Sequence, residues 1–196
     1  MPRRYTMVRR AEKTAQTRRR TELALIELLA TQPYSAITIG DIAASAGVAV
    51  RTVQRHYASK DALLADCLRF PADALAEEFD RLPRAPSPEA GLRDLLTGLF
   101  SFYEANSRQA WAVYSRARDV PLLEELRQAT IRAHEGLVNA LIDDWPEAWT
   151  DRRTARAGIL AMTALGTFQA FTYAGRFSVA DAVEFTARAL ERTLLK

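Results

Sequence analysis

Hydrophobic positions recur at helical spacing along almost the whole chain. In the stretch after Ser87, apolar residues come three or four positions apart, as they do on one face of a helix; they are Leu92, Leu95, Leu96, Leu99, Phe102 and Tyr103. Alternating β-branched runs are nearly absent, and Ala, Leu, Glu and Arg are abundant. These residue types favour helices. The pattern predicts an all-α fold.

Caps and helix-breaking residues between the apolar stripes predict where the helices begin and end. We expect helices at about 17–31, 39–46, 50–56, from 59 onward, from 88 onward, around Trp111 and Tyr114, at 121–145, at 151–175 and from 178 to the end. The sequence PRAPSPE, at 83–89, is the clearest linker. Within it, Ser87 is placed to cap the next helix, with Pro88 at the first helical position.

One stretch raises the question of a membrane span. The nineteen residues from Ala157 to Gly175 carry no charge, and a membrane helix needs about 20 apolar residues. However, Thr163, Thr167 and Gln169 interrupt the stretch, and its small residues outnumber the large aliphatic ones. A helix buried on most sides, against the rest of the chain or another subunit, is the favoured interpretation. The N-terminus lacks the apolar segment of a signal peptide, so we expect no membrane and a cytoplasmic location.

The stretch TIGDIAASAGVAVRTVQRHYASK, which begins at Thr38, predicts two short helices around a glycine. Thr38 and Asp41 have the spacing of a capping box, and Gly47 permits the sharp turn between the helices. Val53 and Tyr57 lie four positions apart on the side that faces the body. A helix-turn-helix of this kind holds its second helix rigidly outward. The second helix then presents mostly polar residues, which are Arg51, Thr52, Gln54, Arg55 and His56.

The charge of the chain is unevenly distributed. The first 64 residues hold eleven Lys and Arg against five Asp and Glu, a net charge of +6, whereas the remainder has sixteen against nineteen, a net charge of −3. Eight of the basic residues fall within the first twenty, which we expect to include a disordered basic arm at 1–16. A basic N-terminal third suggests a polyanionic partner. The alternative is that the arm is a solvated, solubilising segment.

The run TIGDIAASAGV, followed by RTVQRHYASKDALL, resembles the DNA-binding motif of TetR-family transcriptional regulators. A Thr opens the first short helix, an Ala-Gly-Val turn follows, an aromatic residue closes the second helix, and Ser-Lys opens the next one. The close resemblance covers about 38–64; the rest matches only by its number and order of helices. It implies a three-helix DNA-binding domain at 17–58, followed by a larger effector-binding and dimerisation domain at 59–196.

The resemblance assigns phosphate contacts to four residues: Thr38, Thr52, His56 and Lys60. It places Val50 and Arg51 at the bases, where an Arg can donate two hydrogen bonds to a guanine. Gln54 stands where the family usually has a tyrosine, so it bonds either to adenine or to phosphate. Arg55 is a backbone contact or a solvated charge. His56 has the alternative of partial burial beside its neighbour Tyr57.

The resemblance also implies a homodimer through 151–196, which would bind a palindromic site on double-stranded DNA. It implies a repressor that a small-molecule effector of unknown identity releases from its operator. The sequence offers aromatic and polar residues for the effector pocket: Phe102, Tyr103, Trp111, Tyr114, His134 and Gln169. The alternative is that these residues belong to the core, since aromatic residues at helical spacing are more often core than ligand pocket.

Other functions fit the sequence less well. A non-specific DNA-packaging protein would explain the basic arm but not the long apolar body, and a small-molecule-binding protein or an enzyme remains a further alternative. Two histidines and the single Cys67 cannot build a typical zinc site. There is no phosphate-binding glycine loop and no readable catalytic triad. We therefore expect a protein that is not an enzyme and needs no cofactor or metal.

Overall fold

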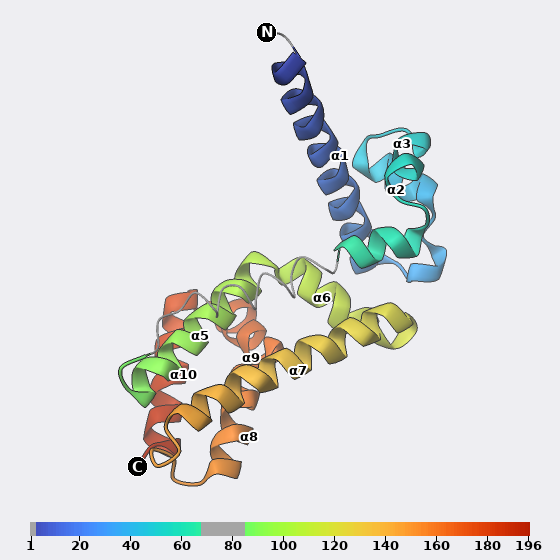
Figure 1. The fold of residues 1–196 in the computed structure, drawn as a ribbon. Helices are drawn as coiled ribbons and strands as arrows, with labels where there is room; N and C mark the ends of the chain where they lie inside the picture. Colours follow the sequence, from blue (N-terminus) through green and yellow to red (C-terminus); the bar gives the residue numbers. More distant parts are fainter. Residues whose placement is uncertain (1–2, 68–84) are drawn as a thin grey trace. The chain divides into compact units, whose positions relative to one another are not determined.

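The computed structural model describes residues 3–67 and 85–196 (Figure 1). These residues are helical almost throughout. No strand occurs among them, although an isolated antiparallel bridge joins Trp149 to Leu195 near the C-terminus. The all-α prediction is confirmed for the described part of the chain.

The helices follow the predicted caps closely. Their bounds are α1 Arg3–Thr31, η1 Tyr34–Ala36, α2 Ile39–Ala46, α3 Val50–His56, α5 Pro88–Ala105, α6 Ser107–Arg116, η2 Ala117–Asp119, α7 Pro121–Asp144, α8 Arg152–Met162, α9 Leu165–Gln169, η3 Ala170–Ala174 and α10 Val179–Leu194. Residues 60–67 are also helical. The two short helices predicted at 39–46 and 50–56 are confirmed. Residues 83–84 of the predicted linker lie outside the described residues.

The chain forms two compact units. Among the described residues, unit 1 comprises 3–67 and 111–127, and unit 2 comprises 85–110 and 128–196. Unit 1 therefore includes residues well beyond 58, where we expected the DNA-binding domain to end. The reason lies in its core, where Ala117, Val120 and Leu123 pack with the buried side chains of α1, α2 and α3.

The core of unit 1 is built from aliphatic side chains that are completely shielded from solvent. Leu25 and Leu29 of α1 meet Ile42 of α2 and Val53 of α3 in this core. Cys67 is also buried there, and burial raises the pKa of its thiol. A buried thiol with a raised pKa is unreactive, which agrees with the structural role that its apolar surroundings indicate.

Helix α1 is longer than the sequence pattern predicts. It begins at Arg3, whereas we expected a disordered arm at 1–16 and a helix from about 17. Residues 3–31 contain no Gly or Pro and are rich in Arg, Ala, Glu and Leu, so nothing in their intrinsic preferences ends the helix earlier. The predicted arm is thus a helical extension from residue 3 onward.

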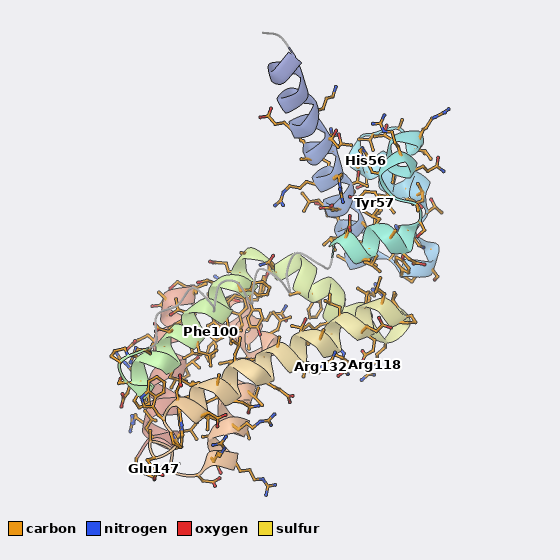
Figure 2. The ribbon with its side chains drawn as sticks, in the orientation of Figure 1. His56, Tyr57, Phe100, Arg118, Arg132 and Glu147 are labelled. Atoms are coloured by element: carbon orange, nitrogen blue, oxygen red, sulfur yellow. The ribbon has the colours of Figure 1, made fainter. Side chains whose placement is uncertain are left out.

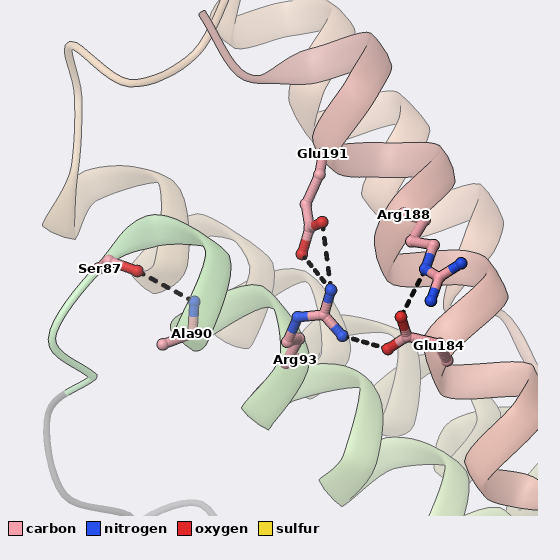
Figure 3. Close-up of polar contacts among 6 residues, drawn as sticks. All are labelled: Ser87, Ala90, Arg93, Glu184, Arg188 and Glu191. Carbon is pink, nitrogen blue, oxygen red and sulfur yellow. Dashed lines mark hydrogen bonds and ion pairs between the residues drawn. The ribbon is translucent and has the colours of Figure 1, made fainter.

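Unit 2 is built mainly on the packing of α5 against α10. Helix α5 begins as predicted, with the Ser87 hydroxyl accepting a hydrogen bond from the Ala90 backbone at 3.3 Å. Phe100 is completely buried, and its ring lies 5.3 Å from that of Phe168. At the surface, Arg93 of α5 pairs with two carboxylates of α10 (Figure 3). These contacts fix the orientation of α10 on the unit.

The prediction of one continuous helix at 151–175 is wrong. The structure divides it into α8, α9 and the π-helical turn η3, with Ala164 in an extended conformation between the first two. The Thr163 hydroxyl donates to the Ile159 carbonyl at 2.6 Å, and Thr167 donates to the Ala161 carbonyl at 2.7 Å. Threonine hydroxyls that bond backbone carbonyls compete with the helical hydrogen-bond pattern. No helix of the described residues has the length and apolarity that a membrane crossing requires.

Candidate nucleic-acid interface

The turn between α2 and α3 is fixed by hydrogen bonds at both ends of α2. At its start, the Thr38 hydroxyl accepts from the Asp41 backbone at 3.1 Å, and the Asp41 carboxylate accepts from the Thr38 backbone at 2.9 Å. At its end, Gly47 adopts a left-handed conformation with φ of 63°. Arg20 of α1 donates to the carbonyl groups of Ala46 and Gly47. The capping box and the glycine turn predicted from the sequence are both confirmed.

Two side chains anchor α3 on the unit. Val53 is completely buried, and Tyr57, directly after the helix, is nearly so. The Tyr57 hydroxyl donates to a carboxylate oxygen of Glu22 on α1 at 2.8 Å. Because both anchors lie on one side of a seven-residue helix, the opposite side is left to solvent.

Six of the eight predicted DNA contacts lie in α3 itself, whereas Thr38 directly precedes α2 and Lys60 begins the helix of residues 60–67. The exposed members of the set are Thr38, Val50, Arg51, Gln54 and Arg55, and the half-buried members are Thr52, His56 and Lys60. Val50 exposes 43% of its surface, which is unusual for a large aliphatic side chain so close to a core. Ala49 at the start of α3 offers no side-chain cap. Val50 and Ala49 are thus exposed, whereas the anchors Val53 and Tyr57 are buried in the core.

His56 lies beside Tyr57 at the end of α3 (Figure 2). The two rings are 6.4 Å apart in an edge-to-face arrangement. Partial burial lowers the pKa of His56 below its ordinary 6.5, and the charges of Arg55 and Arg18 lower it further. The side chain is therefore mainly neutral at pH 7, so it can offer a ring N–H to a phosphate but little charge.

Lys60 has partners inside the unit. Its ammonium group donates to the carbonyls of Tyr34 and Ile37 at 2.6 and 2.7 Å, and it lies 4.0 Å from the centre of the Tyr34 ring. These bonds fasten the turn before α2 to the helix of residues 60–67. An ammonium has three donors, so one remains for another acceptor, and the phosphate contact of Lys60 stays a prediction.

Two arginines that we assigned to the basic N-terminal segment instead hold unit 1 together. Arg18 pairs with Asp66 and lies 5.5 Å from the centre of the Tyr57 ring, and Arg20 binds the end of α2. The sequence pattern missed both roles, because the partners lie 26 to 48 residues further along the chain. Arg19, between them, is exposed.

The six effector-pocket candidates do not all lie in the same unit. Trp111 and Tyr114 belong to unit 1 and expose 50% and 40% of their surfaces. The other four belong to unit 2: Phe102, Tyr103, His134 and Gln169. Tyr103 is a core residue, whose ring lies 5.7 Å from that of Phe168.

His134 is the best-defined polar group among these candidates. Its Nε2 lies 2.6 Å from the Thr163 hydroxyl. Because that hydroxyl already donates to the Ile159 carbonyl, Nε2 must be the donor and Nδ1 is left as the acceptor in the neutral ring. Burial lowers the pKa of His134, only partly offset by the charge of Glu135. A neutral imidazole fixed in one tautomer is able to orient a ligand by its Nδ1 atom.

In a comparison with known protein families, the part of the chain that matches is the one that contains the helix-turn-helix. The family model described as bacterial regulatory proteins of the tetR family matches residues 24–67. No curated protein sequence gives a significant match.

Solved structures resemble the whole chain. NalD of Pseudomonas aeruginosa, the secondary repressor of the MexAB-OprM multidrug efflux pump, is 22% identical with a TM-score of 0.70, over 94% of this chain and 98% of NalD. A transcriptional regulator of a Rhodococcus species is 23% identical with a TM-score of 0.66, over 90% and 97%. FadR of Bacillus subtilis, solved with stearoyl-CoA, is 18% identical with a TM-score of 0.61, over 88% and 95%.

At these identities the likeness concerns the fold, and the family match is confined to the motif. The matched residues 24–67 contain the capping box, the left-handed glycine and the outward helix α3 described above. Residues 24–67 carry the DNA-binding domain of the tetR family of bacterial regulatory proteins, and the chain is a DNA-binding transcriptional regulator.

Proposed function

We propose that the protein is a homodimeric repressor that binds a palindromic operator through α3 and leaves it when a small molecule binds. The observation that carries the proposal is the exposed side of α3, which holds Arg51 and Gln54 outward while Val53 and Tyr57 fix the helix from behind. A rigid helix with its N-terminal residues exposed fits the major groove of DNA.

Each exposed residue has a distinct role in this proposal. Arg51 donates two hydrogen bonds to the N7 and O6 atoms of a guanine, and Val50 contacts a thymine methyl group. Gln54 bonds to adenine or to phosphate. Phosphate contacts come from the remaining residues and fix the orientation of the unit on the duplex; they are Thr38, Thr52, Arg55, His56 and Lys60.

The dimer contact is proposed for residues 151–196. Large hydrophobic side chains are exposed here: Tyr173 at 68%, Phe185 at 51% and Phe177 at 36%. The rings of Phe171, Phe177 and Phe185 lie within 5.3 to 6.1 Å of one another. Exposed apolar patches of this kind mark protein interfaces. One motif reads only a few base pairs, so a two-fold pair with half-sites about 34 Å apart, or a multiple of that distance, is the expected arrangement.

Release by an effector follows as a shift between two conformations of the dimer. The ligand favours the one whose α3 helices no longer match the spacing of the half-sites, and such coupling typically amounts to about 1–3 kcal/mol. The candidates for ligand contacts in unit 2 are Phe102, Tyr103, His134 and Gln169. A cytoplasmic location is part of this proposal.

The test is selection of bound duplexes from a random DNA pool with the purified protein. We expect an inverted repeat, bound at least about 1,000-fold more tightly than random DNA at physiological salt. A specificity ratio near one would instead support DNA packaging. Titration of the bound complex with stearoyl-CoA, the ligand of FadR, with free coenzyme A as control, is the first test of release by an acyl ligand.

A further inference from the structure

Helix α10 turns one side away from its own unit and toward an open groove. Six residues of the helix line that groove: Asp181, Glu184, Phe185, Arg188, Ala189 and Arg192. They follow one another at alternating intervals of three and one, so they form a single continuous face of the helix. Arg176 and Phe177, which precede the helix, complete the lining.

The opposite side of α10 is fully occupied. Ala182, Thr186 and Ala187 are completely buried, and Leu190 and Leu194 nearly so. The groove face is therefore presented by a helix that cannot rotate without losing its core.

Charges on the groove face are segregated by sign. The acids Asp181 and Glu184 lie in the N-terminal half, and the bases Arg188 and Arg192 lie in the C-terminal half, with Phe185 between them. Along the sequence, Asp181 and Arg192 are equally far from the midpoint of the face, which falls between Phe185 and Arg188. Glu184 and Arg188 lie close to that middle on either side. When the order of the residues along the face is reversed, each acid therefore falls opposite a base.

A two-fold axis performs that reversal. In a two-fold contact, residue i of one copy meets residue j of the other, and j meets i. Two α10 helices placed antiparallel across such an axis bring Asp181 against the partner subunit's Arg192 and Glu184 near the partner subunit's Arg188. Each attraction then occurs twice. A parallel arrangement would place like charges together.

The contacts inside the chain hold these charges in place. Glu184 pairs with Arg93 of α5 and with Arg188 (Figure 3), while Arg188 stays 70% exposed. Arg192 makes no ion pair among the residues at 3–67 and 85–196. Asp181 accepts hydrogen bonds from Ser178 at the start of α10 but remains exposed. Asp181, Arg188 and Arg192 are thus exposed to a neighbouring molecule, and Glu184 keeps 43% of its side chain exposed beside its two ion pairs.

We propose that this face is a self-recognition surface, which pairs α10 antiparallel with α10 of a second copy and selects an identical chain over other regulators by its order of charges. The occupant of the groove is the partner's Phe185 with its flanking charges. Aromatic side chains surrounded by polar groups are typical of the centre of an interface. This inference rests on the proposed dimer and adds the register and the specificity of the contact.

The experiment is a charge exchange between two variants of the full chain. Arg188→Glu and Glu184→Lys each place like charges opposite one another at two symmetric points, so we expect each variant alone to dimerise about tenfold or more weakly than the natural protein. In an equimolar mixture, the mixed dimer keeps the natural pair at one point and sets the introduced glutamate opposite the introduced lysine at the other. We expect it to form about as tightly as the natural dimer, measured by sedimentation or by fluorescence transfer between labelled chains.

The mixture separates this role from a loss of folding. Both variants also place two like charges within one α10, and Glu184→Lys further places a lysine beside Arg93 of α5. These repulsions within the chain persist in the mixed dimer, whereas the repulsion between subunits is relieved. Thermal unfolding of each variant measures the first effect on its own. Matched charge reversals away from the groove are Arg132→Glu in α7 and Glu147→Lys in the loop after it, both exposed (Figure 2). We expect these controls to dimerise normally.

Three outcomes would overturn the inference in distinguishable ways. If the natural protein is a monomer at micromolar concentration, the proposed dimer fails together with the inference. If it is a dimer but the single variants dimerise normally, the dimer stands and the α10 face is not its contact. If the variants are weakened but the mixture recovers nothing, the face contributes to stability and not to pairing.

Discussion

Helices α3 and α10 each leave one side uncovered, and the two sides differ in their charges. The exposed and half-buried residues of α3 include Arg51 and Arg55 and no acid. The groove face of α10 has acids in one half and bases in the other, around Phe185. A surface of one sign suits a polyanion, which presents a uniform row of phosphates. A surface that complements itself on reversal suits a second copy of the same chain.

Both helices depend on the same local chemistry for their position. A capping box starts α2, which sets the turn into α3, and another starts α10. Gly47 and the anchors Val53 and Tyr57 then orient α3, whereas α10 relies on an amphipathic stripe over sixteen residues. The same kind of cap therefore positions a DNA-binding helix in one case and a proposed dimer helix in the other. Substitutions at matched positions in the two caps separate their contribution to folding from their contribution to binding.

The largest effect is expected from Arg51→Ala on the affinity for the selected DNA. Loss of the two hydrogen bonds to a guanine should weaken binding by about 1–3 kcal/mol, or roughly five- to 150-fold, while the free energy of unfolding changes little. Anisotropy of a labelled duplex gives the affinity. Arg118→Ala, an exposed arginine of unit 1 outside α3, is the control. Equal losses for the two variants would mean that Arg51 supplies only charge.

A second substitution tests the turn that orients α3. Gly47→Ala places a methyl group on a left-handed residue, and its Cβ would lie 2.7 Å from the Arg20 guanidinium. The backbone strain alone costs about 1–2 kcal/mol. We expect unit 1 to lose about that much stability in denaturant titration, and DNA binding to weaken with it. Gly136→Ala, in α7 with open space around its Cβ, should not destabilise the protein.

The two capping boxes give a matched pair. Thr38→Ala and Ser178→Ala each remove the hydroxyl that accepts from the third residue of a helix, and each should cost about 1 kcal/mol of stability. The expected difference is in binding, because only Thr38 is proposed to contact phosphate. Its variant should lose DNA affinity at a temperature where both variants remain folded. If both lose affinity equally, Thr38 acts through stability alone.

The smallest effect is a pH dependence from His134. Its pKa in the folded protein lies below the ordinary 6.5, because burial disfavours the charged ring. The unfolded chain therefore takes up the proton first as the pH falls through 6.5, so the free energy of unfolding should decrease from pH 7 toward pH 5. His134→Gln keeps a donor for the Thr163 hydroxyl and cannot titrate. Its unfolding curve should be less dependent on pH over this range, and an unchanged slope would assign the dependence elsewhere.

The helix-turn-helix could be predicted from the sequence because its determinants are local. Thr38 and Asp41 are three residues apart, Gly47 marks the turn, and the spacing of Val53 and Tyr57 identifies the buried side. Each signal acts within a few residues of the structure it specifies. The predicted bounds of α2 and α3 therefore agree with those observed.

Features that depend on distant partners could not be predicted in the same way. The bonds of Arg20 to the end of α2 and of Lys60 to Tyr34 and Ile37 join residues 23 to 27 positions apart. The break at Thr163 involves His134 from another helix. Local patterns indicated only a basic arm, a phosphate contact and a continuous helix. The folded packing supplied the partners that changed these assignments.

The central claim is that the uncovered side of α3 reads bases, and one measurement tests it most directly. Selection from the same random pool with the natural protein and with Arg51→Ala yields two binding motifs. We predict an inverted repeat for both, with the same half-site spacing, and loss of preference at one symmetric position in the motif of the variant. Identical motifs would show that Arg51 does not contact a base and would contradict the account.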